Sequence, residues 1–171
     1  MASNSLQPGI EAAENTNQQF LRFYLDCNVR VMLAIAQITE VLKIEFSQIV
    51  PIPHMPPWVM GVYNWRGDIL WMVDLGHLLG LNSWDRIGLG ECNVVVLSPN
   101  KAIPGAEDNI HLGLVVCRVE DLEECNQREI QSTSKTATQI AFASGYWSKP
   151  DGEISVLDGQ AIARAMPTLA D

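Results

Sequence analysis

Apolar and polar residues alternate along much of this chain, which is the pattern of half-buried β-strands. One such run covers residues 20–25 and a second covers 29–33. Asp26-Cys27-Asn28 between them supplies turn residues, so the two runs are predicted to form a hairpin. The preceding residues, 1–18, are small and polar and are expected to form a flexible tail.

The next two stretches do not alternate in this way. Residues 34–43 fit either one face of a helix or a turn followed by a strand, because their apolar residues are partly β-branched. Residues 50–58 read VPIPHMPPW, and four prolines in nine residues exclude a helix interior or a central strand. A stiff connector is therefore predicted there.

A hairpin followed by a short helix is predicted twice. The first unit runs from Gly61 to Asp74 and the second from Gly145 to Asp158, so thirteen positions separate glycine from aspartate in both. Each unit contains an aromatic-bearing strand, a turn, an apolar strand and an aspartate whose carboxylate can cap a helix. Either the chain contains two similar half-domains, or the two units resemble each other by chance.

The remaining segments add strands and connections. Short apolar runs at 94–97 and 112–116 are predicted to be buried strands, with a loop over 98–109. The polar stretch 120–139 is predicted to be a long connection. Many short strands and few short helices predict an all-β barrel or sandwich. Two halves of about 70–80 residues would each have a marginal core, so we expect them to share a hydrophobic seam.

The composition narrows the range of partners. The chain has 171 residues, 47% of them hydrophobic, and 20 acidic residues against 11 basic ones give a formal charge of −9. Nucleic acid and anionic membranes attract clustered Lys and Arg, and the sequence has no such run. We therefore expect neither nucleic-acid binding nor direct membrane insertion.

No motif predicts catalysis or a cofactor. The four cysteines form no CxxC pair, and the three histidines show no metal-ligand spacing, so no metal site is predicted. Neither a nucleophile elbow nor a phosphate-binding loop is present in the sequence. The N-terminal residues lack the pattern of a signal peptide, which favours a cytoplasmic protein with free thiols.

The segment from Pro53 to Leu75 resembles the signature of CheW-like domains, which have a proline-rich approach, Gly-Val, Asn-Leu-Arg-Gly and an apolar strand ending in Asp-Leu. The resemblance extends over roughly residues 18–166. The matching positions in the signature are Gly61, Val62, Asn64, Arg66, Gly67, Asp74 and Leu75.

Three positions depart from the family pattern. Trp65 replaces the usual Leu, Trp71 stands where Pro is common, and Cys117 stands where Asp is frequent. The two tryptophans keep their positions apolar but add bulk, which would reshape a partner surface. Cys117 puts in doubt any polar role of its position.

The resemblance implies an all-β fold of two packed, SH3-like, five-stranded barrels with a few short helices. The implied fold is one domain over residues 19–167, with two subdomains at approximately 19–85 and 90–167 that can exchange strands. The implied partners are the regulatory domain of a CheA-type histidine kinase and the cytoplasmic tip of a methyl-accepting-type receptor, bound in the groove between the barrels.

The implied function is a non-catalytic adaptor that couples receptor to kinase in bacterial chemotaxis, phototaxis or pilus-driven motility, recruited to receptor arrays at the inner membrane. One alternative is a small-ligand-binding or regulatory module with the same two-barrel fold. Another is a kinase regulatory domain that acts without a receptor.

The expected partner-binding residues lie in two segments. Arg66, with Asn64, Trp65 and Gly67, lies at the predicted hairpin turn, and Arg and Trp are enriched among interface hot spots. A solvated turn arginine is the alternative. By resemblance, Ile35, Ile38 and Glu40 lie near the receptor groove, although the isoleucines could equally be ordinary core. Arg66-Gly67-Asp68 also spells an adhesion tripeptide, but nothing in the sequence supports export.

Overall fold

The computed structural model describes residues 16–26, 28–81, 90–97, 111–132 and 139–167. The predictions for residues 1–15, for Cys27 and for the loop at 98–109 lie outside the described residues. The expected tail is two residues too long, because the first strand already begins at Asn17.

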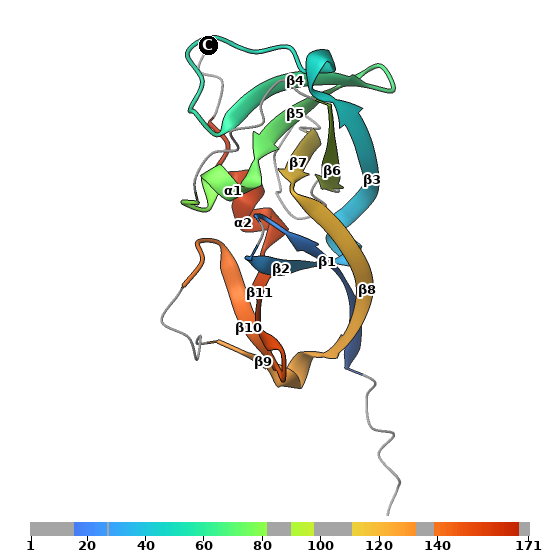
Figure 1. Cartoon of the computed structure of the whole chain (residues 1–171), viewed down its shortest axis with the longest axis vertical. Helices are drawn as coiled ribbons and strands as arrows, with labels where there is room; N and C mark the ends of the chain where they lie inside the picture. Colours follow the sequence, from blue (N-terminus) through green and yellow to red (C-terminus); the bar gives the residue numbers. More distant parts are fainter. Residues whose placement is uncertain (1–15, 27, 82–89, 98–110, 133–138, 168–171) are drawn as a thin grey trace, which may run out of the picture.

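The described strands form two sheets, each curled into a small barrel, and one barrel lies above the other in Figure 1. The first barrel contains, in spatial order, β8 (Arg118–Asn126), β1 (Asn17–Tyr24), β2 (Arg30–Ala34), β11 (Gly152–Leu157), β10 (Ala143–Lys149) and β9 (Ile130–Gln131). The second barrel contains β3 (Ile38–Glu45), β6 (Glu91–Leu97), β7 (His111–Val116), β5 (Asp68–Asp74) and β4 (Val59–Trp65). The predicted all-β class is confirmed.

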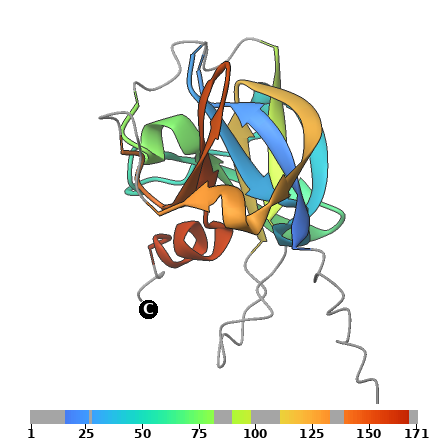
Figure 2. The same ribbon diagram turned by 90° about the horizontal axis from the view of Figure 1, so that it is seen from below.

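Helices are few and short, as predicted. The α-helices are α1 (Leu75–Leu78) and α2 (Gly159–Arg164), and α2 lies beside the first barrel when the molecule is seen from below (Figure 2). Single 3₁₀ turns are η1 (Ile35–Gln37), η2 (Phe46–Gln48) and η3 (Gln127–Glu129). The ambiguous stretch 34–43 is thus a turn followed by a strand.

The connection predicted over 120–139 is wrong for its first part, because strand β8 extends to Asn126 and pairs with β1. On this strand an apolar side chain faces the solvent and a charged side chain faces the interior. Leu122 points outward and is 59% exposed, whereas the side chain of Glu123 is only 19% exposed. A strand with charged residues on its inner face carries no amphipathic signal, so alternation could not reveal it.

The sheets divide the chain differently from the predicted halves 19–85 and 90–167. The N-terminal hairpin β1–β2 belongs to the barrel built from the C-terminal strands β8–β11, whereas β3–β7 form the other barrel. β7 passes directly through Cys117 into β8, so the chain crosses between barrels there. Strand exchange is therefore the organising feature of the fold.

The two hairpin–helix units occupy equivalent places. β4–β5–α1 and β10–β11–α2 each contain a register shift just before the glycine, Gly61 in one and Gly145 in the other. The Asp74 carboxylate accepts from the His77 N–H at 3.1 Å, and the Asp158 carboxylate accepts from the Gln160 N–H at 2.9 Å. Because strand order and direction also match around both units, the duplication interpretation is favoured over chance similarity.

Three apolar clusters fill the molecule. One lies inside each barrel, and the third is a seam between the barrels. The seam combines residues of β1 and β2, such as Phe23 and Leu33, with residues of β6 and β7, such as Val95 and Leu114, all four fully buried. The expected shared seam is therefore present, and it fixes how the barrels sit against each other.

Gly61 allows the second barrel to close. Val50 forms an isolated bridge with Val62 and crosses over Gly61 so closely that a Cβ built there would lie 2.1 Å from the Val50 carbonyl oxygen. The φ of Gly61 is +140°, a conformation that side-chain-bearing residues rarely adopt. Gly145 has a similar role, because its Cβ would lie 2.3 Å from Ile130 Cγ2.

We expect Gly61→Ala to lower the free energy of unfolding by about 3 kcal/mol or more, because it combines backbone strain with a clash against a backbone oxygen. Gly67→Ala is the matched control, since Gly67 has a φ of +90° but no atom within 4 Å of its Cβ position. Its cost should be about 1–2 kcal/mol. Urea unfolding followed by circular dichroism measures both, and equal costs would contradict the closure role.

Candidate partner-binding site

Arg66 and Gly67 form the turn between β4 and β5, and both residues have a positive φ. Arg66 has a φ of +55° and Gly67 a φ of +90°, which is the two-residue hairpin turn that matches strand twist. The Asn64 side-chain oxygen accepts from the Gly67 N–H at 3.0 Å and fixes the turn. An arginine in the left-handed region costs about 1–2 kcal/mol relative to its usual conformations.

Glu40 of β3 holds both Trp65 and Arg66. One carboxylate oxygen accepts from the Trp65 indole N–H, and the other accepts from Arg66 Nη2 at 2.6 Å. The Arg66 guanidinium also lies 5.4 Å from the Trp65 ring centre, within reach of a cation–π contact. Arg66 nonetheless remains 68% exposed. The site therefore positions a cation and leaves its outer surface open to a partner.

His111 and Asp68 complete this group, and neither was among the expected partner-binding residues. The His111 imidazole meets Trp65 edge-on, with ring centres 5.0 Å apart and planes at 63°. His111 Nε2 lies 3.9 Å from an Asp68 carboxylate oxygen, while Nδ1 is buried without a hydrogen-bond partner. No motif marks His111 in the sequence. It lies beneath Trp65 because β7 runs parallel to β5, with His111 opposite Leu70.

Ile35 and Ile38 lie apart from this group. Both are partly buried and pack against the seam, as does Trp71. Packing within the fold therefore accounts for these side chains without a partner. The structure brings Asn64, Trp65, Arg66, Gly67 and Glu40 together at the hairpin tip and places the two isoleucines at the edge of the seam.

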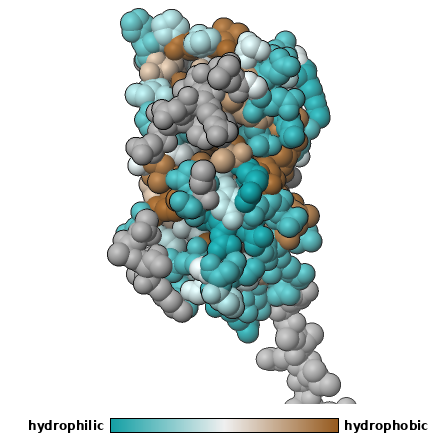
Figure 3. Space-filling model, viewed as in Figure 1, coloured by the Kyte–Doolittle hydropathy of each residue, from teal (hydrophilic) through white to brown (hydrophobic). Residues whose placement is uncertain are grey.

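Exposed apolar side chains lie on or beside the strands that carry the hairpin tip. Ile69, which pairs with Asn64 across the hairpin, is 62% exposed, and Val50, which pairs with Val62, is 60% exposed. Val41 lies next to Glu40 and is 43% exposed. Figure 3 shows further hydrophobic surface at the level where the two barrels meet. Arg66 thus has apolar surface close to it.

The described residues contain neither a metal-ligand cluster nor a membrane-spanning helix. Among them, no group of three or more His, Cys, Asp or Glu side chains could hold a metal ion, and no helix is long and apolar enough to cross a membrane. Cys92 and Cys125 lie in the barrel interiors, where burial raises the pKa of each thiol to about 11. Neither is therefore activated as a nucleophile.

We expect Trp65→Phe to lower the free energy of unfolding by about 1–3 kcal/mol, because one oxygen of the partly buried Glu40 carboxylate loses its donor. Trp71→Phe removes a similar ring area from a partly buried residue at the seam and serves as the control. Chemical unfolding of both variants measures the difference. A cost for Trp65→Phe no larger than that for Trp71→Phe would show that the indole–carboxylate bond contributes little.

The raised thiol pKa values predict slow alkylation of the folded protein. At pH 8, Cys92 and Cys125 should react with iodoacetamide roughly two orders of magnitude more slowly than in the unfolded chain, because little thiolate is present. The rates should rise with pH up to about 11. Mass spectrometry of timed samples locates the modified residues. Labelling of either thiol at its unfolded rate would contradict the burial described here.

Comparison with known proteins identifies the family. The chemotaxis protein CheW of Rhizobium meliloti (strain 1021) is 31% identical over 97 residues, which cover 56% of this chain and 56%, about half, of that relative. The crystal structure of the scaffolding protein TtCheW from Thermoanaerobacter tengcongensis matches with a TM-score of 0.66 at 22% identity, covering 82% of this chain and 88% of that one, which confirms the predicted pair of SH3-like barrels. The CheW-like domain family matches residues 19–166, and the chain belongs to that family.

Proposed function

We propose that this protein is a non-catalytic adaptor that couples a chemoreceptor-type sensor to a CheA-type histidine kinase. Family membership and the match to a chemotaxis protein support this role. Bivalent binding would be the mechanism: one surface holds the kinase regulatory domain and another holds the receptor tip, so that receptor state can bias kinase activity. The protein would work in the cytoplasm and be recruited to receptor arrays at the inner membrane.

The observation that carries the proposal is the way Arg66 is held. The residue occupies a strained conformation, its guanidinium is oriented by Glu40 and Trp65, and its outer surface is open to solvent. Strained residues held in place by their neighbours are concentrated at functional sites. A guanidinium fixed in this way can donate to a carboxylate of a partner with little further loss of side-chain entropy.

The other site residues have supporting roles in this proposal. Asn64 and Gly67 set the turn, Glu40 and Trp65 orient the guanidinium, and His111 supports Trp65 from below. Ile35 and Ile38 would contribute apolar contacts at the edge of the seam, where a receptor helix could lie between the barrels. Chemotaxis is the behaviour that the relatives favour, while phototaxis and pilus-driven motility remain alternatives within the same proposal.

Arg66→Asn separates binding from stability. Asparagine tolerates positive φ, so relief of strain offsets the loss of the exposed Arg66–Glu40 pair, and the free energy of unfolding should change by less than about 1 kcal/mol. Binding to the receptor tip or the kinase regulatory domain should weaken at least about tenfold, as for an interface hot spot. Isothermal titration calorimetry with each partner measures the effect.

Arg128→Asn is the matched control, because it removes the same charge from an exposed position on the other barrel. It should leave both affinities unchanged. Unaltered affinity of Arg66→Asn for both partners would contradict the role of Arg66. Failure of the unmodified protein to bind either partner would contradict the adaptor proposal itself and favour a ligand-binding or regulatory module.

A further inference from the structure

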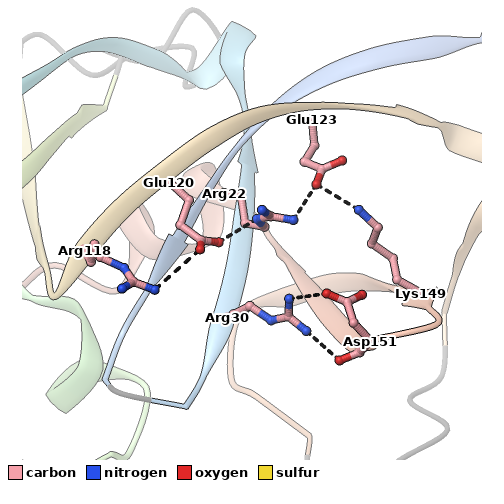
Figure 4. Close-up of polar contacts among 7 residues, drawn as sticks. All are labelled: Arg22, Arg30, Arg118, Glu120, Glu123, Lys149 and Asp151. Atoms are coloured by element: carbon pink, nitrogen blue, oxygen red, sulfur yellow. Dashed lines mark hydrogen bonds and ion pairs between the residues drawn. The ribbon is translucent and has the colours of Figure 1, made fainter.

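The two barrels differ in charge at one pair of equivalent positions. Aligning Gly61 with Gly145, and then following the strand registers, places His111 at the position of Arg30. Arg30 of β2 donates to the Asp151 carboxylate at 2.7 Å and to the Asp151 carbonyl at 2.8 Å (Figure 4). A guanidinium keeps its positive charge throughout the physiological pH range. The first barrel therefore has a permanent ion pair at this position.

The second barrel has a group of variable charge in the same place. His111 Nε2 lies 3.9 Å from a carboxylate oxygen of Asp68, the first residue of β5 after the turn that carries Arg66. A neutral imidazole is too far from that oxygen for a hydrogen bond, whereas an imidazolium is attracted to it at this distance. Histidine is also the side chain that ordinarily changes charge between pH 5 and 8. The ion pair of the second barrel therefore depends on pH.

The surroundings of the His111 ring suit its neutral form. The side chain is 13% exposed and lies on the same face of β7 as Val115, a member of the second barrel's core. Its Nδ1 is buried without a hydrogen-bond partner. A neutral imidazole can leave Nδ1 unprotonated, but an imidazolium has an N–H at both nitrogens. Because a buried N–H without an acceptor is strongly unfavourable, the protonated ring does not fit this position.

Movement toward Asp68 would satisfy both nitrogens of the protonated ring. The Asp68 side chain is 67% exposed, so a ring that approaches its carboxylate also approaches water. There Nε2 could donate to the carboxylate and Nδ1 to solvent. Protonation therefore favours a position of the ring that is displaced from the barrel interior.

Trp65 links the His111 ring to Arg66. The ring centres of His111 and Trp65 are 5.0 Å apart, and Trp65 is only 9% exposed. The Trp65 indole N–H donates to one oxygen of Glu40, whose other oxygen accepts from Arg66 at 2.6 Å. Because protein cores are close-packed, Trp65 would relax into the space that a departing His111 ring leaves. That movement would weaken the indole–Glu40 bond and loosen the hold on the Arg66 guanidinium.

Other ionisable groups near His111 do not change charge in the same pH range. The described elements around it contribute Glu40 of β3, Tyr63 of β4, Arg66 of the turn, Asp68 of β5 and Cys92 of β6. Burial raises the pKa of the Cys92 thiol to about 11. Carboxyl groups ordinarily titrate below pH 5, and phenols and guanidinium groups titrate above pH 8. A change between these limits therefore reports on the imidazole.

We propose that His111 is a positioning residue for Arg66 and that its protonation releases the Arg66 guanidinium from its fixed orientation. The neutral ring supports Trp65, which in turn holds Glu40 and Arg66 in place. The protonated ring moves toward Asp68 and removes that support. The consequence for partner binding rests on the proposed function: the Arg66 tip would bind its partner less tightly as the pH falls toward 5.5.

NMR titration of the labelled protein from pH 8 to 5.5 tests the positioning role without a partner. The probes are the His111 ring C–H, the Trp65 indole N–H and the Arg66 side-chain N–H. All three resonances should shift with one common midpoint, because one proton changes all three environments. A Trp65 indole resonance that stays constant while His111 titrates would overturn the proposal.

His111→Phe keeps an aromatic ring beneath Trp65 but cannot take up a proton. In this variant the Trp65 and Arg66 resonances should stay constant over the same pH range. His77→Phe is the matched control, because it makes the same exchange on α1, and the response of Trp65 should persist in it. A Trp65 shift that persists in His111→Phe would overturn the proposal. If His111→Phe does not fold, unequal midpoints of His111 and Trp65 in the unmodified protein would overturn it instead.

Isothermal titration calorimetry with the receptor tip and the kinase regulatory domain tests the consequence for binding. Affinity for the partner of the Arg66 tip should fall about threefold to tenfold between pH 7.5 and 5.5, the cost of ordering one released side chain again. His111→Phe should abolish this dependence, and an equal dependence in that variant would overturn the link to binding. If neither partner binds at any pH while the NMR midpoints agree, the adaptor proposal fails and the positioning role of His111 stands.

Discussion

The seam between the barrels is the contact on which the rest of the structure depends. It is a continuous apolar cluster drawn from both barrels, and its members include fully buried residues such as Phe23, Leu33, Val95 and Leu114. Strand exchange strengthens this constraint, because the N-terminal hairpin β1–β2 belongs to the barrel of the C-terminal strands. The barrels therefore cannot separate while both remain folded, and each small core is supported by the other.

A fixed seam also explains how a protein without evident chemistry could act as a scaffold. The hairpin tip that carries Arg66 belongs to the second barrel, and the edge of the seam near Ile38 lies where the two barrels meet. Rigid packing between them holds these two surfaces at a constant separation and orientation. For the proposed adaptor this matters, because a receptor can influence a kinase only if the link between their binding surfaces does not flex freely.

Sequence patterns revealed those parts of the fold in which apolar side chains are buried and polar side chains are exposed. The two hairpin–helix units, their aspartate caps and the need for a shared seam were all visible, because apolar alternation and capping residues are local signals. Strand β8 was not visible, because Glu123 faces inward and Leu122 outward. At the candidate site the motif indicated Arg66, but His111 comes close to Trp65 only through parallel pairing of β7 with β5, which depends on tertiary structure.

The central claim is that the seam and the strand exchange make the two barrels one cooperative unit. Native-state hydrogen exchange tests this claim most directly. Under conditions where exchange reports opening free energy, the slowest amides of β1 and of β6 should open with the same free energy, equal to that of global unfolding. The two values should also fall in parallel with added denaturant. A first barrel that opens at least about 2 kcal/mol more easily than the second, by a separate transition, would contradict the account.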